Sequence, residues 1–255
     1  EFLSRVGVQP NLLKRVQTVF SVPCGASEGL IEDYARLAED CGLRKVLFVE
    51  APYLVALGSD VVFSESNPVF AMDIGGGVTN IAVLSLGGII SGLSMNIGGH
   101  NMDANIIEKM ARQNGLNIGD LTAERIKNEI GSLSEKARAS TVAQGSSVET
   151  FYPASIAVQS AEITDCIRGY IDKILEYAGM VLNQLPAEVA AAVNKNGLCL
   201  SGGVARIDGV AEYISKKTGM DVHVTDEPQF AVVSGGGMIA RDGRLYNAFA
   251  KKYEN

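Results

Sequence analysis

The sequence predicts an α/β fold in which helices flank a mixed sheet. Short apolar runs of strand type alternate along the chain with amphipathic stretches of helical period. Residues 69–97 read as three consecutive strands joined by glycine turns, the pattern of an antiparallel meander. Residues 18–49 follow the order strand, helix, strand, which implies a parallel pair with a right-handed crossover. Because both kinds of pairing occur in one chain, we expect a mixed sheet.

Composition allows a large core and excludes some function classes. The 255 residues suffice for one large domain or two, and 47% of them are hydrophobic while 20% are charged. The formal net charge of −7 argues against nucleic acid as a partner. No apolar run approaches the length of a membrane span.

The cysteines and histidines do not form a metal-binding pattern. Two histidines, His100 and His223, are isolated, so we interpret each as a surface or edge residue. The cysteines contain no Cys-x-x-Cys pair, and in a chain expected to stay in the cytosol they are interpreted as reduced core residues. They are Cys24, Cys41, Cys166 and Cys199.

The first part of the chain is expected to hold two strands and two helices. Residues 18–22 and 45–49 are apolar runs of strand type. Between them, Ser27 is an N-cap candidate for a helix that ends near Cys41. A short apolar helix is predicted over residues 52–58.

The next stretch carries the most informative motif. Asp73-Ile-Gly-Gly-Gly77 lies between two predicted strands, residues 69–72 and 79–86, and a third strand follows from Ile89. A glycine run lets backbone N–H groups approach an anion closely, because no Cβ is in the way. Asp73, at the head of the run, is placed to hold a divalent cation through water beside phosphates.

Gly75, Gly76 and Gly77 are therefore candidate phosphate-binding residues, with Val78 at the end of the turn and the Thr79 hydroxyl as a further donor. The alternative is an ordinary glycine-rich hairpin with a solvated aspartate. The run is not a Walker A loop, because no Gly-Lys-Ser/Thr follows it. It is not a Rossmann fingerprint, because a strand and not a helix follows it.

Two helices are expected after the meander. The first starts at Asn101 or Asp103 and ends at Gly115. Thr122 is predicted to cap a second helix over residues 123–130.

The segments around this second helix are less regular, and a long helix follows them. Residues 116–120 are interpreted as a loop, and residues 148–152 and 155–158 as a small hairpin. A long helix is predicted over residues 160–185, and Pro186 restarts or breaks it.

The remaining elements return to short strands and helices. Strands are predicted over residues 197–200 and 222–224, with a helix over residues 207–218 between them. The next predicted helix contains Gly235-Gly236-Gly237, which is costly in a helix and suggests close packing on a neighbour. Residues 241–253 are predicted to form a surface helix.

Two further pairs complete a candidate site. Glu124 and Lys127 lie one turn apart on the same face of a predicted helix, which alone is typical of a surface pair. Gly202-Gly203-Val204 ends a predicted strand, which alone is typical of a turn. Together with the glycine turn they fit a nucleotide held between two lobes: phosphates at the turn, ribose hydroxyls at Glu124 and Lys127, and adenine against Gly202–Val204.

Seven stretches in this order resemble the MreB family of bacterial actin homologues. They are spread over nearly all of the chain, and the helical stretch after Thr122 is the most specific of them. The matching stretches are Phe20-Ser-Val-Pro-Cys-Gly25, Val49-Glu-Ala-Pro52 with Ala56-Leu-Gly58, Asp73-Ile-Gly-Gly-Gly77, Ile97-Gly-Gly99 with Met102-Asp103, Thr122-Ala-Glu-Arg-Ile-Lys-Asn-Glu-Ile-Gly131, Leu200-Ser-Gly-Gly203 and Val222-His-Val-Thr-Asp-Glu-Pro228.

The resemblance implies an actin-like ATPase fold, which is ribonuclease-H-like. It implies a partial first domain over residues 1–72, a second domain over residues 73–240 with an accessory subdomain around 120–185, and a tail helix over 241–255. It also implies an ATP-binding, filament-forming cytoskeletal protein involved in cell shape, with ATP or ADP and Mg²⁺ as ligands. We therefore expect a cytoplasmic protein at the inner face of the membrane that self-associates and contacts inner-membrane or morphogenesis proteins.

Two departures from the family bear on its chemistry. Family members open with a strand carrying Asp-x-Gly, the first phosphate turn, which would lie before residue 1; we therefore expect an N-terminally incomplete chain. The family also has Glu directly before the proline of the motif at residues 49–52, where it positions the attacking water. Ala51 stands there, and Glu50 is expected to point to the opposite face of its strand. Val78 also replaces the Thr usual in the family.

These departures leave the chemistry open. We expect ATP hydrolysis to be slow or lost, and Asp73 is the one candidate catalytic residue. Two alternatives to a polymerising MreB-like protein remain. One is a non-polymerising chaperone or activator-type ATPase of the same superfamily. The other is a degenerate nucleotide-binding scaffold, which the substitution at Ala51 favours.

Overall fold

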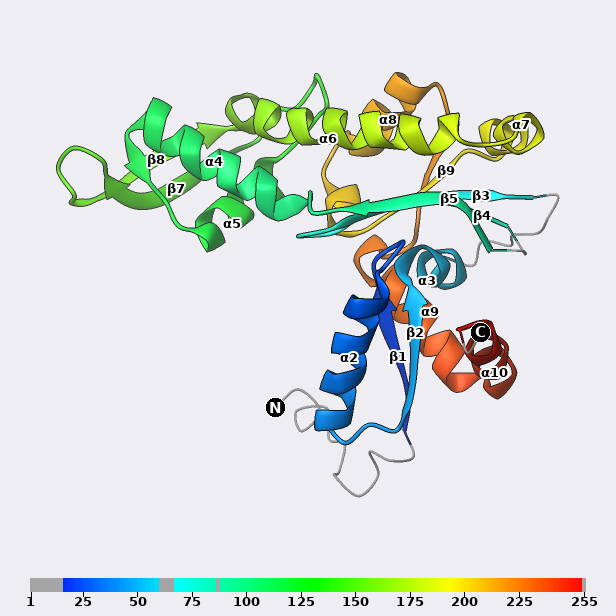
Figure 1. Cartoon of the computed structure of the whole chain (residues 1–255). Helices are drawn as coiled ribbons and strands as arrows, with labels where there is room; N and C mark the ends of the chain where they lie inside the picture. Colours follow the sequence, from blue (N-terminus) through cyan, green and yellow to red (C-terminus); the bar gives the residue numbers. More distant parts are fainter. Residues whose placement is uncertain (1–15, 60–66, 86–87, 254–255) are drawn as a thin grey trace.

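The computed structural model describes residues 16–59, 67–85 and 88–253. Figure 1 shows two parts, one built on a two-stranded sheet and the other on a five-stranded sheet, with a small three-stranded sheet at the far end of the second part. The mixed α/β architecture expected from the sequence is confirmed.

The first part begins with a strand, a helix, a strand and a second helix. β1 and β2 are parallel, with Gln17 opposite Lys45, as the strand–helix–strand order predicted. Ser27 caps the helix between them, because its hydroxyl accepts a hydrogen bond from the N–H of Leu30. The elements are β1 (Gln17–Val22), α2 (Glu28–Asp40), β2 (Lys45–Glu50) and α3 (Ala51–Gly58).

The C-terminal helices return to this first part. α9 (Ala231–Arg241) packs on α3 and β1, and α10 (Gly243–Tyr253) packs on α9 and β2. A Cβ on Gly235 would lie 2.0 Å from the carbonyl oxygen of Leu54, so at this position α9 and α3 touch through their backbones. This confirms the close packing expected of the glycine run.

The second part is a mixed sheet with helices on both faces. Its strand order is β10-β9-β3-β4-β5, in which β3, β4 and β5 form the expected antiparallel meander and β9 and β10 run parallel to β3. The strands are β3 (Val69–Ile74), β4 (Thr79–Ser85), β5 (Gly88–Met95), β9 (Leu198–Ser201) and β10 (Val222–Val224).

Alternation along β3 divides the core between the two faces of this sheet. Phe70 and Met72 pack with residues of α6 (Ser160–Asn183) and α8 (Val210–Thr218), whereas Val69 and Ala71 pack with residues of α3. Because strand side chains alternate, one fully buried strand serves both cores. Figure 1 shows α6 crossing one face of the sheet and α3 lying below the other.

The accessory region forms a third core. Its sheet has the order β6-β7-β8, and helices α4 and α5 pack beside it. Three more elements of helix type, α7 and the short 3₁₀ turns η1 and η2, complete the described chain. The elements are α4 (Gly99–Asn114), β6 (Leu116–Asn117), α5 (Asp120–Ile130), β7 (Ser140–Ser147), β8 (Pro153–Gln159), α7 (Ala187–Asn196), η1 (Gly203–Arg206) and η2 (Pro228–Phe230).

Three local predictions in the accessory region were wrong. The expected loop at 116–120 contains β6, which pairs with the end of β7. The helix begins at Asp120 with Gly119 as its N-cap, so Thr122 lies inside it. The hairpin pairs residues 140–147 with 153–159, and residues 148–152, predicted as a strand, form its turn. The sequence signal was weak there because β7 is rich in serine and has few buried side chains.

Other boundaries shifted by one to three residues. β3 continues through Asp73 to Ile74, so the aspartate lies within the strand. The helix predicted from residue 207 begins at Val210, after the turn η1.

Cys41 is exposed, whereas the other three cysteines are buried as expected. Among the described residues no helix is both long and apolar enough to cross a membrane.

Candidate functional site

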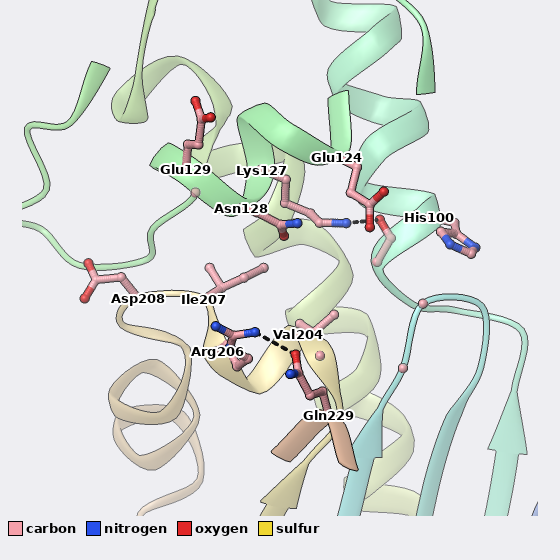
Figure 2. A pocket seen from close by; sticks show the side chains of 15 residues that line it. His100, Glu124, Lys127, Asn128, Glu129, Val204, Arg206, Ile207, Asp208 and Gln229 are labelled. Carbon is pink, nitrogen blue, oxygen red and sulfur yellow. Dashed lines mark hydrogen bonds between the residues drawn. The ribbon is translucent and has the colours of Figure 1, made fainter. Parts of the chain in front are cut away.

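A polar pocket of about 430 Å³ lies where three chain segments meet. Figure 2 shows its walls: the glycine turn with the start of α4, one face of α5, and η1 with Gln229. The lining residues are Gly75, Gly76, Gly99, His100, Glu124, Lys127, Asn128, Glu129, Gly131, Gly203, Val204, Arg206, Ile207, Asp208 and Gln229. The three segments that the sequence analysis combined therefore lie around one pocket.

The glycine turn is bonded to the start of α4 and still exposes backbone donors. The N–H of Gly99 donates to the carbonyl of Gly75 at 3.0 Å, and the N–H of His100 donates to that of Gly76 at 2.8 Å. Within the described residues the N–H groups of Gly76 and Gly77 have no hydrogen-bond acceptor, and both residues are exposed. Exposed, unpaired N–H groups of this kind suit an anion.

Asp73 lies behind the turn and does not line the pocket. Its Oδ1 accepts a hydrogen bond from Ser201 Oγ at 3.0 Å, and Asn80 provides a second side-chain hydrogen bond. Burial raises the pKa of the Asp73 carboxyl, and these two hydrogen bonds oppose that shift. No cluster of three or more metal-binding side chains occurs among the residues that the structure describes.

Four other predicted site residues, Gly77, Val78, Thr79 and Gly202, are also outside the pocket wall. Thr79 is fully buried, and its hydroxyl donates to the carbonyl of Ile97 at 2.7 Å, so it faces away from the pocket. The carbonyl of Val78 closes the turn by accepting from the N–H of Gly75. Gly77 is exposed at the tip of the same turn.

Lys127 lies in the pocket wall and is buried rather than on the surface. Its Nζ donates to Asp103 Oδ2 at 2.8 Å and to the carbonyl of Gly99 at 3.2 Å. Glu124 lies beside it on α5 (Figure 2). Burial raises the pKa of the Asp103 carboxyl, which the hydrogen bond and charge of Lys127 counteract. An ammonium has three donors, so this pair leaves one N–H of Lys127 for another acceptor.

Gly202 and Gly203 have different roles. Gly202 has φ 88°, and a Cβ there would lie 2.2 Å from the carbonyl oxygen of Ile74, so only glycine fits. Gly203 has open space around it and lines the pocket with Val204. The first glycine therefore shapes the turn, and the second leaves room beside it.

Several pocket residues were not predicted. Arg206 Nη1 donates to Gln229 Oε1 at 2.6 Å in the wall of the pocket (Figure 2). His100, expected at a surface or an edge, is exposed and lies over Gly76. Asn128 and Glu129 follow Glu124 by about one turn of α5, and this helical spacing could have indicated them as pocket residues. No local sequence pattern predicts that η1 lies beside α5. The missed residues are Gly99, His100, Asn128, Glu129, Gly131, Arg206, Ile207, Asp208 and Gln229.

Ala51 and Glu50 lie at the junction of β2 and α3. Ala51 is the buried first residue of α3. Glu50 Oε1 accepts a hydrogen bond from the N–H of Gly25 at 2.7 Å, so its carboxylate is bound to the turn after β1. The N–H of the neighbouring Cys24 donates to Asn80 Oδ1 at 3.0 Å, which ties this turn to the strand beside Asp73.

A mixed sheet with an antiparallel meander, and a polar pocket bordered by glycine turns, define an actin-like fold. Solved structures agree with this class. MreB5 of Spiroplasma citri bound to ADP matches with TM-score 0.89 at 24% identity, covering 97% of this chain and 75% of that one. A MamK double helical filament matches with TM-score 0.75 at 20% identity, covering 94% and 76%.

The sequence comparison identifies the family. The sequence model described as MreB/Mbl protein matches residues 1–247. The cell shape-determining protein MreB of Escherichia coli K12 is 32% identical over 238 residues, covering 92% of this chain and 68% of that protein. The chain therefore belongs to the MreB/Mbl family, and it is an actin-like cytoskeletal protein of the MreB type.

Proposed function

We propose that the chain acts in cell shape by binding ATP or ADP with Mg²⁺ in the polar pocket. The observation that carries this proposal is the convergence of the glycine turn, the Glu124–Lys127 face and the Gly203–Val204 turn on one pocket. The phosphates lie at the exposed N–H groups of Gly76 and Gly77. The spare N–H of Lys127 and the carboxylate of Glu124 bind the ribose hydroxyls, and adenine lies against Gly203 and Val204.

The Asp73 carboxylate, behind the glycine turn, suits a Mg²⁺ site whose remaining ligands are phosphate oxygens and water. Mg²⁺ commonly takes one or two carboxylates together with phosphate oxygens and water, so it needs no full protein cage. Asp73 would hold the ion through water, with Ser201 and Asn80 keeping its carboxylate in place. An ion held there would neutralise phosphate charge and would offset the cost of burying the Asp73 carboxylate.

We test nucleotide binding by titrating labelled ATP with Mg²⁺ into the protein and its Gly203→Asp variant. Gly203 borders the pocket and has room for a side chain, so the variant folds and its carboxylate repels the nucleotide. Gly29→Asp is the matched control, because Gly29 is equally open and lies in α2, away from the pocket. Saturable binding that Gly203→Asp weakens at least about tenfold is expected. Equal binding by both variants would place the nucleotide elsewhere.

We also propose that hydrolysis is slow or absent. In-line attack on a γ-phosphate needs an oriented water, and Ala51 has no side-chain acceptor for it. Glu50 is committed to the N–H of Gly25, so it does not substitute.

Phosphate release from wild type, Ala51→Glu and Ala51→Gln tests this point. Loss of one positioning or general-base group commonly lowers a rate by about 10²–10⁴, so Ala51→Glu is expected to raise the rate within that range. Glutamine has nearly the volume of glutamate but no basic carboxylate, so Ala51→Gln is expected to raise the rate far less than Ala51→Glu. A wild-type rate that Ala51→Glu leaves unchanged would show that another residue positions the water.

We propose head-to-tail self-association into filaments, in the cytoplasm and at the inner face of the membrane with morphogenesis proteins. Heterologous contacts between copies that do not close a ring give open filaments. The filament formed by MamK, which shares this fold, supports the proposal. Sedimentation at micromolar concentration with ATP and Mg²⁺ is expected to pellet the protein. A monomer in the supernatant at every concentration would favour the non-polymerising alternative.

A further inference from the structure

His100 is the second residue of α4, and it lines the polar pocket beside the glycine turn. Its backbone N–H donates to the carbonyl of Gly76 at 2.8 Å, which holds the residue on the turn. A Cβ on Gly76 would lie 3.0 Å from His100 Nε2, and a Cβ on Gly77 would lie 3.8 Å from its Nδ1. The ring is therefore next to the two glycines whose N–H groups are exposed (Figure 2).

The imidazole ring of His100 is open to a ligand. The residue is exposed, and within the described part of the chain no hydrogen bond involves its ring nitrogens. An imidazole carries one N–H donor in its neutral form and two in its cationic form. The ring therefore adds a side-chain donor to the backbone donors of Gly76 and Gly77.

Permanent positive charge is scarce at the glycine turn. Among the described residues that line the pocket, three carboxylates face two permanent cations; they are Glu124, Glu129, Asp208, Lys127 and Arg206. Lys127 is paired with Asp103, and Figure 2 shows Arg206 on the η1 side of the pocket, bonded to Gln229. His100 is therefore the lining side chain that lies on the turn and can become cationic.

The groups around His100 favour its cationic form. Asp103 follows it by about one turn of α4. Burial raises the pKa of the Asp103 carboxyl, and the charge of His100 is one of the influences that lower it. From α5, Glu124 and Lys127 line the same pocket, and the charge of Lys127 is opposed by Asp103. On the side of the turn the glycines carry no charge, and Asp73 is buried behind them.

We propose that the imidazolium of His100 binds a phosphate of the nucleotide directly, together with the N–H groups of Gly76 and Gly77. This inference rests on the proposed nucleotide site and adds a ligand whose charge depends on pH. Imidazole changes its charge between about pH 5 and pH 8, so the affinity for nucleotide phosphates rises as the pH falls through this range. A charge-assisted hydrogen bond to phosphate is also stronger than a neutral one.

The test titrates ATP with Mg²⁺ into wild type, His100→Gln and His100→Lys at about pH 6 and about pH 8.5. At the lower pH wild type is expected to bind about tenfold more tightly than His100→Gln, and at the higher pH within about twofold. His100→Lys keeps its charge and is expected to bind more tightly than His100→Gln at both. Protonation of ATP itself cancels, because the proteins are compared at the same pH.

Two controls isolate the contact. His223→Gln changes the one other histidine of the sequence, which is exposed on β10 and outside the pocket, and it is expected to bind ATP like wild type at both pH values. Adenosine, which has no phosphate, is expected to bind equally to wild type and His100→Gln.

The outcomes separate this inference from the nucleotide site itself. Saturable ATP binding with the same affinity in wild type and His100→Gln at both pH values would overturn the inference and leave the site in place. A loss in His100→Gln that is equal at both pH values would also overturn it, because the contact would then not depend on charge. Absence of saturable ATP binding by wild type would overturn both proposals.

Discussion

The two three-glycine runs of the chain, residues 75–77 and residues 235–237, are alike in sequence and differ in environment. In the helical run, Gly235 is in contact with backbone of α3. A Cβ on Gly236 would make only an ordinary van der Waals contact with Val19, at 3.8 Å, and a Cβ on Gly237 would meet no atom within 4 Å. In the turn, the nearest atom to a Cβ on Gly76 would be a flexible side-chain atom of His100, at 3.0 Å. In the helical run, packing inside the protein therefore requires glycine at Gly235, whereas the turn leaves space and backbone donors at a pocket.

This difference teaches that the same residue pattern has two physical causes. Close helix packing excludes a Cβ because a backbone carbonyl lies where the Cβ would be. At the turn, a Cβ on Gly75 would lie 3.0 Å from the carbonyl oxygen of Val78, whereas the chain itself tolerates a Cβ at Gly76 and Gly77. At these two positions the requirement for glycine comes from the proposed ligand. A substitution at the packed glycine is expected to lower stability, whereas a substitution in the turn is expected to lower nucleotide binding with little change in stability.

The largest effect on stability is expected for Gly235→Ala. The added Cβ would lie 2.0 Å from the carbonyl oxygen of Leu54, so α9 and α3 must separate. We expect a loss of about 1–3 kcal/mol in the free energy of unfolding, measured by urea denaturation. Gly237→Ala is the matched control in the same helix, and it is expected to gain up to about 1 kcal/mol through helix propensity. Equal effects at the two positions would show that contact with α3 is not the cause.

A smaller and different effect is expected for Gly77→Ala. The nearest atom to the new Cβ is His100 Nδ1 at 3.8 Å, so the unfolding free energy is expected to change little. ATP affinity is expected to fall about tenfold, because the methyl group hinders approach of a phosphate to the backbone N–H groups. Gly237→Ala again serves as control and is expected to bind ATP like the wild type. Unchanged affinity in Gly77→Ala would remove the turn from the phosphate site.

The smallest effect is expected for Asp73→Asn, and it depends on pH. Burial raises the pKa of the Asp73 carboxyl, so folding favours its protonated form. The stability that the protonated carboxyl contributes is fully present below pH 3.8, the pKa of the carboxyl in the unfolded chain. It is lost as the pH rises through the higher pKa of the folded state. The asparagine amide carries no ionisable group, so the variant is expected to be more stable than wild type at pH 7 without nucleotide.

The difference between Asp73→Asn and wild type is expected to shrink as pH falls, and urea denaturation from pH 7 down to pH 4 measures it. Binding of ATP with Mg²⁺ is expected to weaken in the same variant. A stability difference that stays constant with pH would mean that the carboxylate is not the origin of the effect.

Local patterns in the sequence identified most elements of the fold. Hydrophobic period, Ser27 as a cap and glycine after helices predicted the strands and helices of both parts within a few residues. The serine-rich strand β7 was misplaced, because its exposed side chains follow no strong alternation. Its position is set by pairing with β8 and β6, which are non-local contacts.

The sequence by itself determined the meander, the glycine turn, the helical Glu124–Lys127 pair and the membership of the MreB/Mbl family. Each depends on neighbouring residues or on a family pattern that is written in order along the chain. Tertiary structure alone decided that Thr79 faces inward, that Lys127 is buried on Asp103, and that Arg206 and Gln229 form a hydrogen bond in the pocket wall. Those features depend on contacts between segments that lie far apart in the chain. The hydrophobic period of one segment shows which of its faces is buried, but it does not show which other segment packs against that face.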